Sequence, residues 1–159
     1  KAMYLSENHD RQRALDVVRA SSSLPFVSKI VEVDGIPMLD GGIADSIPVQ
    51  HAIDMGWQHN VVVLTRNKGW RDMGKDHKIP YLYKNYPRLR VALSHRHRAY
   101  NEQIQLVDDL EAAGKITCIR PIRPLEVGRI EKDTDKLERL YEEGFMLGEA
   151  FCEKCVEKE

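Results

Sequence analysis

Residues 31–49 read VEVDGIPMLDGGIADSIPV, and this stretch holds the strongest local signals in the chain. Two apolar runs, 31–33 and 36–39, flank the dipeptide Asp34-Gly35. An Asp-Gly pair between apolar runs predicts a β-hairpin, because a type I′ turn needs positive φ at both central residues. The second run ends directly in Asp40-Gly41-Gly42.

Helices and strands are predicted alternately on both sides of this stretch. Residues 61–64, VVVL, form an unbroken apolar run, which predicts a strand covered on both faces, as in a parallel sheet. The other predicted elements are a helix over 11–20, a helix over 47–55 that ends at Gly56, a loop over 67–80, a helix over 89–113 and a strand over 115–119. The last helix follows the N-cap cluster Asp133-Thr134-Asp135 and carries the apolar residues Leu137, Tyr141, Leu147 and Phe151. This alternation predicts an α/β fold with a mostly parallel sheet and covering helices.

The composition indicates one folded domain, with 159 residues of which 42% are hydrophobic and 31% are charged. No apolar run approaches the roughly 18 residues of a membrane span. Three cysteines are too few for a disulfide framework and indicate a reducing compartment. We therefore expect a cytoplasmic protein, whose net charge of −1 indicates no particular class of partner.

Charge is distributed unevenly along the chain. Residues 66–98, the basic stretch, hold ten Lys and Arg against two acids, interleaved with four aromatic residues: Trp70, Tyr81, Tyr83 and Tyr86. Cations interleaved with aromatic residues suit an anionic lipid interface, so the basic stretch is a candidate for peripheral membrane contact. A solvated loop and helix face has the same composition. No RNA-binding signature accompanies it, and we expect no nucleic-acid partner.

Asp40-Gly41-Gly42 is the strongest candidate for chemistry. It follows a predicted strand and precedes a predicted helix, which is where open α/β sheets bind ligands. A carboxylate at that place can orient or deprotonate a nucleophile, and two glycines let other backbone approach closely. The alternative is a plain turn, since Asp and Gly are common turn residues.

The residues around this tripeptide resemble a known family. Residues 19–26, read RASSSLPF, and residues 39–49, read LDGGIADSIPV, resemble the second half of the bacterial patatin-like phospholipases, with Ile47 in place of the family's usual Asn. The resemblance implies part of a three-layer α/β hydrolase domain that cleaves a lipid or other acyl ester through a Ser–Asp dyad, without metal or cofactor. Asp40 matches the dyad carboxylate, the proton acceptor, and Gly41 and Gly42 would shape its turn.

The family's nucleophilic serine stands in a Gly-x-Ser-x-Gly elbow beside a glycine-rich loop, and these 159 residues contain neither. We therefore expect the C-terminal portion of a longer protein, inactive as an isolated chain. Residues 1–120 would form the C-terminal half of the hydrolase domain, and residues 121–159 a helical extension packed on it. Without its first strands, the sheet would expose an edge that can pair with a second copy of the chain or with the missing half supplied as a separate chain.

Other reactive residues are assigned to structural roles. Ser21 to Ser23 are predicted at a helix C-terminus, whose partial negative charge opposes an alkoxide. His95 and His97 are two positions apart on a predicted helix, so their rings diverge and we expect no metal site. Cys152 and Cys155 share a helix face, but no second ligand pair completes a zinc site, which leaves core packing or a frayed C-terminal tail.

A second hypothesis describes the chain as a non-catalytic module. Asp40 is then only a turn residue, and the basic stretch binds a membrane or a protein partner. The variant Asp40→Asn separates the two hypotheses, because it abolishes hydrolysis only if the carboxylate takes part in the reaction.

Overall fold

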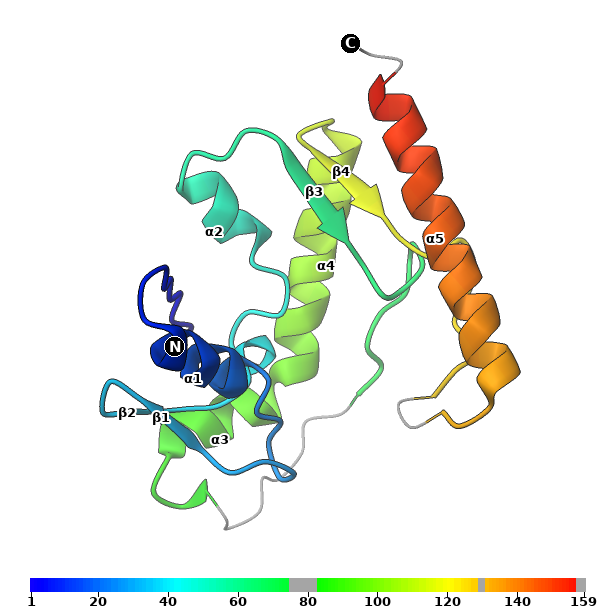
Figure 1. Cartoon of the computed structure of the whole chain (residues 1–159). Helices are drawn as coiled ribbons and strands as arrows, with labels where there is room; N and C mark the ends of the chain where they lie inside the picture. The colour runs from blue at the N-terminus through cyan, green and yellow to red at the C-terminus, as the bar shows by residue number, and fades with distance from the viewer. Residues whose placement is uncertain (75–82, 129–130, 157–159) are drawn as a thin grey trace. The chain divides into compact units, whose positions relative to one another are not determined.

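The computed structural model describes residues 1–74, 83–128 and 131–156 (Figure 1). They fall into two compact units, each drawn from two segments of the chain. Unit 1 lies within residues 1–48 and 72–104, and unit 2 within residues 49–71 and 105–159. The long helix α4 (Arg96–Ala112) runs from the first unit into the second.

In unit 1, helix α1 (Arg11–Ser21) begins where the sequence predicts it, with Asp10 as N-cap. The Asp10 carboxylate accepts hydrogen bonds from the backbone N–H groups of Gln12 (2.9 Å) and Arg13 (3.1 Å), which have no partner inside the helix. Contacts join α1 to the first strand of the unit. The buried core cluster consists of Ala20, Val31 and Val33.

The predicted hairpin is confirmed as strands β1 (Val31–Val33) and β2 (Ile36–Met38), which pair antiparallel. Asp34 (φ 52°) and Gly35 (φ 76°) both have positive φ, as a type I′ turn requires. The hairpin is a sheet of its own. The chain is therefore α/β in character, but its described strands form one antiparallel and one parallel pair instead of one mostly parallel sheet.

The single helix expected over 89–113 is wrong, because the chain forms two helices, α3 (Pro87–Ser94) and α4. Between them His95 leaves helical geometry, with φ −108° and ψ 10°. The Ser94 hydroxyl donates to the Val91 carbonyl at 2.8 Å, a local bond that competes with the helical ladder. The apolar periodicity continues across this break and therefore does not reveal it.

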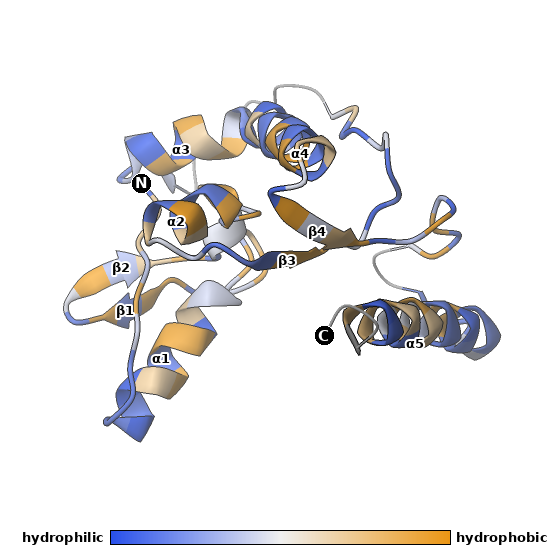
Figure 2. Ribbon diagram, turned by 90° about the horizontal axis from the view of Figure 1, so that it is seen from above, coloured by the Kyte–Doolittle hydropathy of each residue, from blue (hydrophilic) through white to orange (hydrophobic). Residues whose placement is uncertain are grey.

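In unit 2, strand β3 (Asn60–Val63) pairs in parallel with β4 (Ile116–Ile119), as the sequence predicts. Figure 2 shows the apolar character of both strands. Val61 and Val63 are nevertheless 50% and 72% exposed, so the expectation of a strand covered on both faces is wrong. Helix α2 (Val49–Asp54) precedes β3 and ends before Gly56, whose φ is 91°. The loop predicted over 67–80 is confirmed for 67–74, and its remainder lies outside the described residues.

Helix α5 (Thr134–Val156) begins at the predicted cluster, where the Asp133 carboxylate accepts from the Asp135 and Lys136 N–H groups. The four apolar residues expected on this helix differ in burial. Leu147 and Phe151 are half-buried, but Leu137 and Tyr141 are 43% and 71% exposed. The reason is helical phase, because a step of six residues from 141 to 147 turns the side chain by about 120°.

None of the helices in the described parts of the chain combines the length and the apolarity needed to cross a bilayer. The domain boundary expected at residue 120 stays a prediction.

Candidate active site

Asp40 lies in unit 1, after β2 and directly before the short 3-10 helix η1 (Gly41–Ile43). Its backbone N–H donates to the Ser23 carbonyl at 2.9 Å, which ties the loop to the segment that follows α1. Its side chain is half-buried, and Oδ1 accepts a 2.7 Å hydrogen bond from the Gly42 N–H. The carboxylate is thus held at one oxygen by the backbone of its own turn.

The two glycines of the loop differ in what surrounds them. A Cβ at Gly42 would lie 3.0 Å from Oδ1 of Asp40, tighter than most real contacts of this kind, so the carboxylate would have to move by a few tenths of an ångström. A Cβ at Gly41 would meet nothing nearer than the Ser21 hydroxyl at 3.8 Å, an ordinary contact. The absence of a side chain therefore matters for the carboxylate at Gly42 and much less at Gly41.

Two residues of α4 hold the loop from the other side, and the sequence analysis missed both in this role. Arg96 Nε donates to the Gly42 carbonyl at 3.1 Å. Gln103 Oε1 accepts from the Ser46 N–H at 3.0 Å and from the Ile47 N–H at 3.2 Å. The partners are 54 to 57 positions apart in the chain. No local pattern in the sequence predicts contacts between residues this far apart in the chain.

Asp45 and Ser46 complete this support. Gln103 Nε2 donates to Asp45 Oδ1 at 2.8 Å, and the Tyr4 hydroxyl donates to Asp45 Oδ2. The Ser46 hydroxyl donates to the Gly42 carbonyl at 2.6 Å. These hydrogen bonds hold the loop from within unit 1, which favours one fixed position for the Asp40 carboxylate.

A cavity of about 220 Å3 lies beside the loop in unit 1. Asp40 and Gly41 form part of its wall, and Arg88 of α3 adds a cation. The apolar part of the lining includes Ile30, Met38, Ile43, Leu89 and Ala92. A carboxylate at the wall of an apolar cavity can act on a polar group whose hydrocarbon part occupies that cavity.

The serines at the end of α1 are engaged with the helix. The Ser22 hydroxyl donates to the Val18 carbonyl at 2.9 Å, and the Ser23 hydroxyl donates to the Arg19 carbonyl at 2.6 Å. Ser23 is buried, with 4% of its surface exposed. These two hydroxyls therefore cap helix carbonyls in this structure.

The candidate metal ligands stay apart. His95 ends α3 while His97 belongs to α4, so the assumption that both lie on one helix is wrong. Cys152 and Cys155 are exposed on α5, and Cys118 is half-buried in β4. Among residues 1–74, 83–128 and 131–156, no three His, Cys, Asp or Glu side chains gather as they would around a metal ion.

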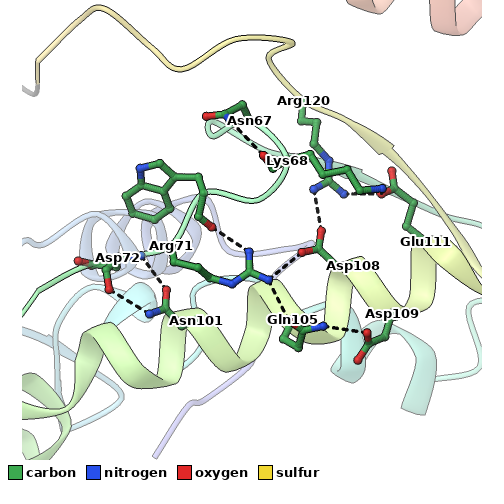
Figure 3. A network of polar contacts seen from close by, with 11 residues as sticks. Asn67, Lys68, Arg71, Asp72, Asn101, Gln105, Asp108, Asp109, Glu111 and Arg120 are labelled. Carbon is green, nitrogen blue, oxygen red and sulfur yellow. Dashed lines mark hydrogen bonds and ion pairs between the residues drawn. The ribbon is translucent and has the colours of Figure 1, made fainter.

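In unit 2, ion pairs join α4 to the loop that follows β3 and to the residue directly after β4 (Figure 3). Arg120, whose side chain is 9% exposed, contacts Asp108 at 2.9 Å and Glu111 at 2.8 Å. Arg71 contacts Asp108 and Lys68 contacts Glu111, both at 3.0 Å. Burial raises the pKa of Asp108, but hydrogen bonds from Arg120 and Arg71 outweigh burial and hold this pKa below its ordinary value.

These contacts also show what several cations of the basic stretch do. Lys68 and Arg71 belong to the ion-pair network, and Arg66 lies over the Trp70 ring, 4.9 Å from its centroid. Arg96 supports the Asp40 loop. Tyr81 and the neighbouring lysines of the stretch lie outside the described residues.

Comparison with known proteins bears on the Asp40 loop directly. Residues 4–53 match the model of the patatin-like phospholipase family. This patatin-like segment contains α1, the hairpin and the whole Asp40 loop. Residues 86–157 match the model of a domain of unknown function, DUF6363.

The chain is also similar to one curated protein, the uncharacterized protein YjjU of Escherichia coli (strain K12). The two are 29% identical over 151 residues, which are 89% of this chain and 41% of YjjU. The chain therefore spans less than half the length of this relative. No solved structure matches the chain. The patatin-like segment supports a lipid-hydrolase family for this part of the chain.

Proposed function

We propose that Asp40 is the proton acceptor of a serine acyl hydrolase that acts on a lipid or a related acyl ester, and that Gly41 and Gly42 shape its turn. The main support is the position of the carboxylate, held by the Gly42 N–H at the wall of an apolar cavity. A base at that place can take the serine proton as the ester carbonyl is attacked. The cavity gives room for the hydrocarbon part of the substrate.

The serine of the proposed dyad lies outside these 159 residues, which contain no Gly-x-Ser-x-Gly sequence. Ser22 and Ser23 donate their hydroxyl protons to carbonyls of α1, which does not suit a nucleophile. The isolated chain is accordingly inactive in this proposal, and it contributes the Asp half of the site.

The test is fluorophosphonate labelling read by intact mass, on the 159-residue chain and on the full-length product of its gene. The probe reports an activated serine whatever the natural substrate is. We expect labelling of the full-length protein only, and its loss in Asp40→Asn. The matched control is Asp54→Asn, which changes an exposed carboxylate of α2 that contacts Gln50.

Three results contradict the proposal in different ways. Labelling of the short chain assigns the nucleophile to one of its own serines. Full labelling of Asp40→Asn removes Asp40 from the reaction. No labelling of either chain removes the hydrolase activity altogether.

A second candidate function is membrane or protein binding without catalysis. Exposed apolar residues in the basic stretch favour it, since Tyr86 and Val91 are 38% and 61% exposed. In this case Asp40→Asn leaves binding unchanged. Arg71→Glu is a poor probe of such binding, because it also breaks the ion pair with Asp108 inside unit 2.

A further inference from the structure

Residues 24–27 of unit 1, Leu24-Pro25-Phe26-Val27, form an apolar turn that is open to solvent, here called the apolar tip. Leu24, Phe26 and Val27 are 54%, 52% and 83% exposed. The Ser28 N–H donates to the Leu24 carbonyl at 2.9 Å and closes the turn. Three large apolar side chains on one exposed turn are unfavourable in water and mark an interaction surface.

The tip is held in a strained conformation. Phe26 has a φ of 67°, a region that a bulky side chain rarely adopts. Tyr83 supports it, because its hydroxyl accepts a 2.9 Å hydrogen bond from the Phe26 N–H and the two rings lie 5.4 Å apart. Tyr83 itself is buried, with 4% exposed. The fold therefore sustains local strain at the turn that keeps these apolar side chains in solvent.

The surface around the tip is cationic. The segments 17–31 and 83–100 meet at the contact between Phe26 and Tyr83. They hold two and five Lys or Arg, respectively; the acids Asp16 and Glu32 flank the first segment, and Asp16 lies 3.9 Å from Arg19. The exposed cations include Arg19, Lys29, Lys84 and Arg88. An anionic lipid surface complements both features, because it offers hydrocarbon to the tip and negative charge to the cations without a shaped partner surface.

The tip is also tied to the Asp40 cavity at both ends. Ser23, directly before it, accepts the Asp40 N–H through its carbonyl. Ile30, shortly after it, lines the cavity together with Arg88. A membrane that takes up the tip would therefore lie close to the cavity and to the Asp40 carboxylate.

We propose that the apolar tip inserts into the interface of an anionic lipid membrane, with the surrounding cations on the lipid head groups. This inference rests on the proposed function, since insertion of the apolar tip would bring a lipid substrate to Asp40. Binding itself requires no hydrolysis, so the two claims fail separately.

The test measures partition of the 159-residue chain into sedimentable phosphatidylcholine vesicles with and without phosphatidylglycerol. We expect stronger partition into the anionic vesicles, weakened by salt. Val27→Asp is expected to lower the partition coefficient about tenfold, because the apolar contact is lost. Lys29→Glu is expected to weaken binding to the anionic vesicles only. Both residues are exposed, and circular dichroism verifies that the variants fold.

The matched control is Met73→Asp, which places the same charge on another exposed residue of unit 1 and is expected to leave partition unchanged. Equal loss in Met73→Asp, or no loss in Val27→Asp, overturns the proposal. Absence of binding to both vesicle types also overturns the proposal and indicates that the apolar tip contacts a protein partner instead.

A second measurement locates the inserted residue. Brominated lipids are expected to quench the added fluorescence of Val27→Trp and not that of Met73→Trp, after subtraction of Trp57 and Trp70 in the unsubstituted chain. The reverse pattern overturns the proposal. A protein that binds vesicles but is never labelled by fluorophosphonate would refute the hydrolase proposal and support insertion of the apolar tip. A protein that is labelled but does not bind vesicles would support the hydrolase proposal and refute insertion.

Discussion

The Asp40 carboxylate depends on a neighbour only two positions away. Gly42 donates the 2.7 Å hydrogen bond to Oδ1 and leaves the space that Oδ1 occupies. Its carbonyl is in turn bound by Arg96 and Ser46, so the peptide groups on both sides of Gly42 are restrained. At the scale of the residue, the site is a carboxylate fixed by the backbone of its own turn.

A methyl group at position 42 is therefore expected to displace the carboxylate. In the full-length product of the gene, Gly42→Ala is expected to lower the rate of fluorophosphonate labelling by up to roughly tenfold, because the carboxylate moves by a few tenths of an ångström and a displacement of about 1 Å can cost about 100-fold. Gly41→Ala is the matched control, because its Cβ meets only the Ser21 hydroxyl at 3.8 Å. Equal rates for the two variants would show that Oδ1 is not the atom that matters.

At the scale of the element, α4 serves two purposes along its length. Its first half supports the Asp40 loop through Arg96 and Gln103. Its second half carries Asp108 and Glu111, which bind Arg120 at the end of β4. The second group anchors the parallel strand pair to the helix, because the guanidinium bridges two carboxylates one helical turn apart.

Arg120→Met is expected to lower the free energy of unfolding by about 3 kcal/mol at neutral pH, since it leaves two partly buried carboxylates without their shared partner. Lys68→Met, at a side chain that is 68% exposed, is expected to cost less than about 1 kcal/mol. Urea denaturation followed by circular dichroism measures both. Equal losses would contradict a special role for Arg120.

The Arg120 effect also has a pH dependence of known sign. Folding lowers the pKa values of Asp108 and Glu111 from their ordinary 3.8 and 4.5. Their stabilisation is therefore present above those ordinary values and is lost as the pH falls through the lowered ones. The difference between wild type and Arg120→Met accordingly shrinks in acid.

At the scale of the whole molecule, the family matches and the compact units have different boundaries. The patatin-like segment, 4–53, runs past the end of the first part of unit 1 into α2. The match over 86–157 starts directly before α3 in unit 1 and ends in unit 2. In the described residues β3 has one partner strand, β4. Its other edge is open, next to the exposed face that carries Val61 and Val63.

We expect the isolated chain to associate with itself through this open edge, as unpaired strands do. Val63→Lys is expected to weaken the association by at least about tenfold, because it removes an apolar contact and places a charge beside the edge. The control is Val18→Lys, at a 63% exposed position of α1. Sedimentation velocity over a range of concentrations measures both. A chain that stays monomeric at every concentration would refute the expectation.

Local chemistry accounts for what the sequence predicted correctly. Helix α1, the Asp34-Gly35 hairpin and the Asp133 cap of α5 all form where expected. Helix caps and turns depend on groups within about four positions of each other, so they can be recognised in the sequence. Asp40 could be nominated for the same reason, since its strand, its glycines and its helix are contiguous.

Packing between distant segments determined the features that could not be predicted from the sequence. The exposure of Val61 and Val63 on β3 depends on which segments from elsewhere in the chain pack against this strand. Hydrogen bonds connect Arg96 and Gln103 with residues of the Asp40 loop that lie more than 50 positions away in the chain. The hydrogen bond from the Phe26 N–H to the Tyr83 hydroxyl likewise joins residues that are 57 positions apart. Such contacts follow from the three-dimensional path of the backbone, because apolar periodicity shows that a face is buried and not what buries it.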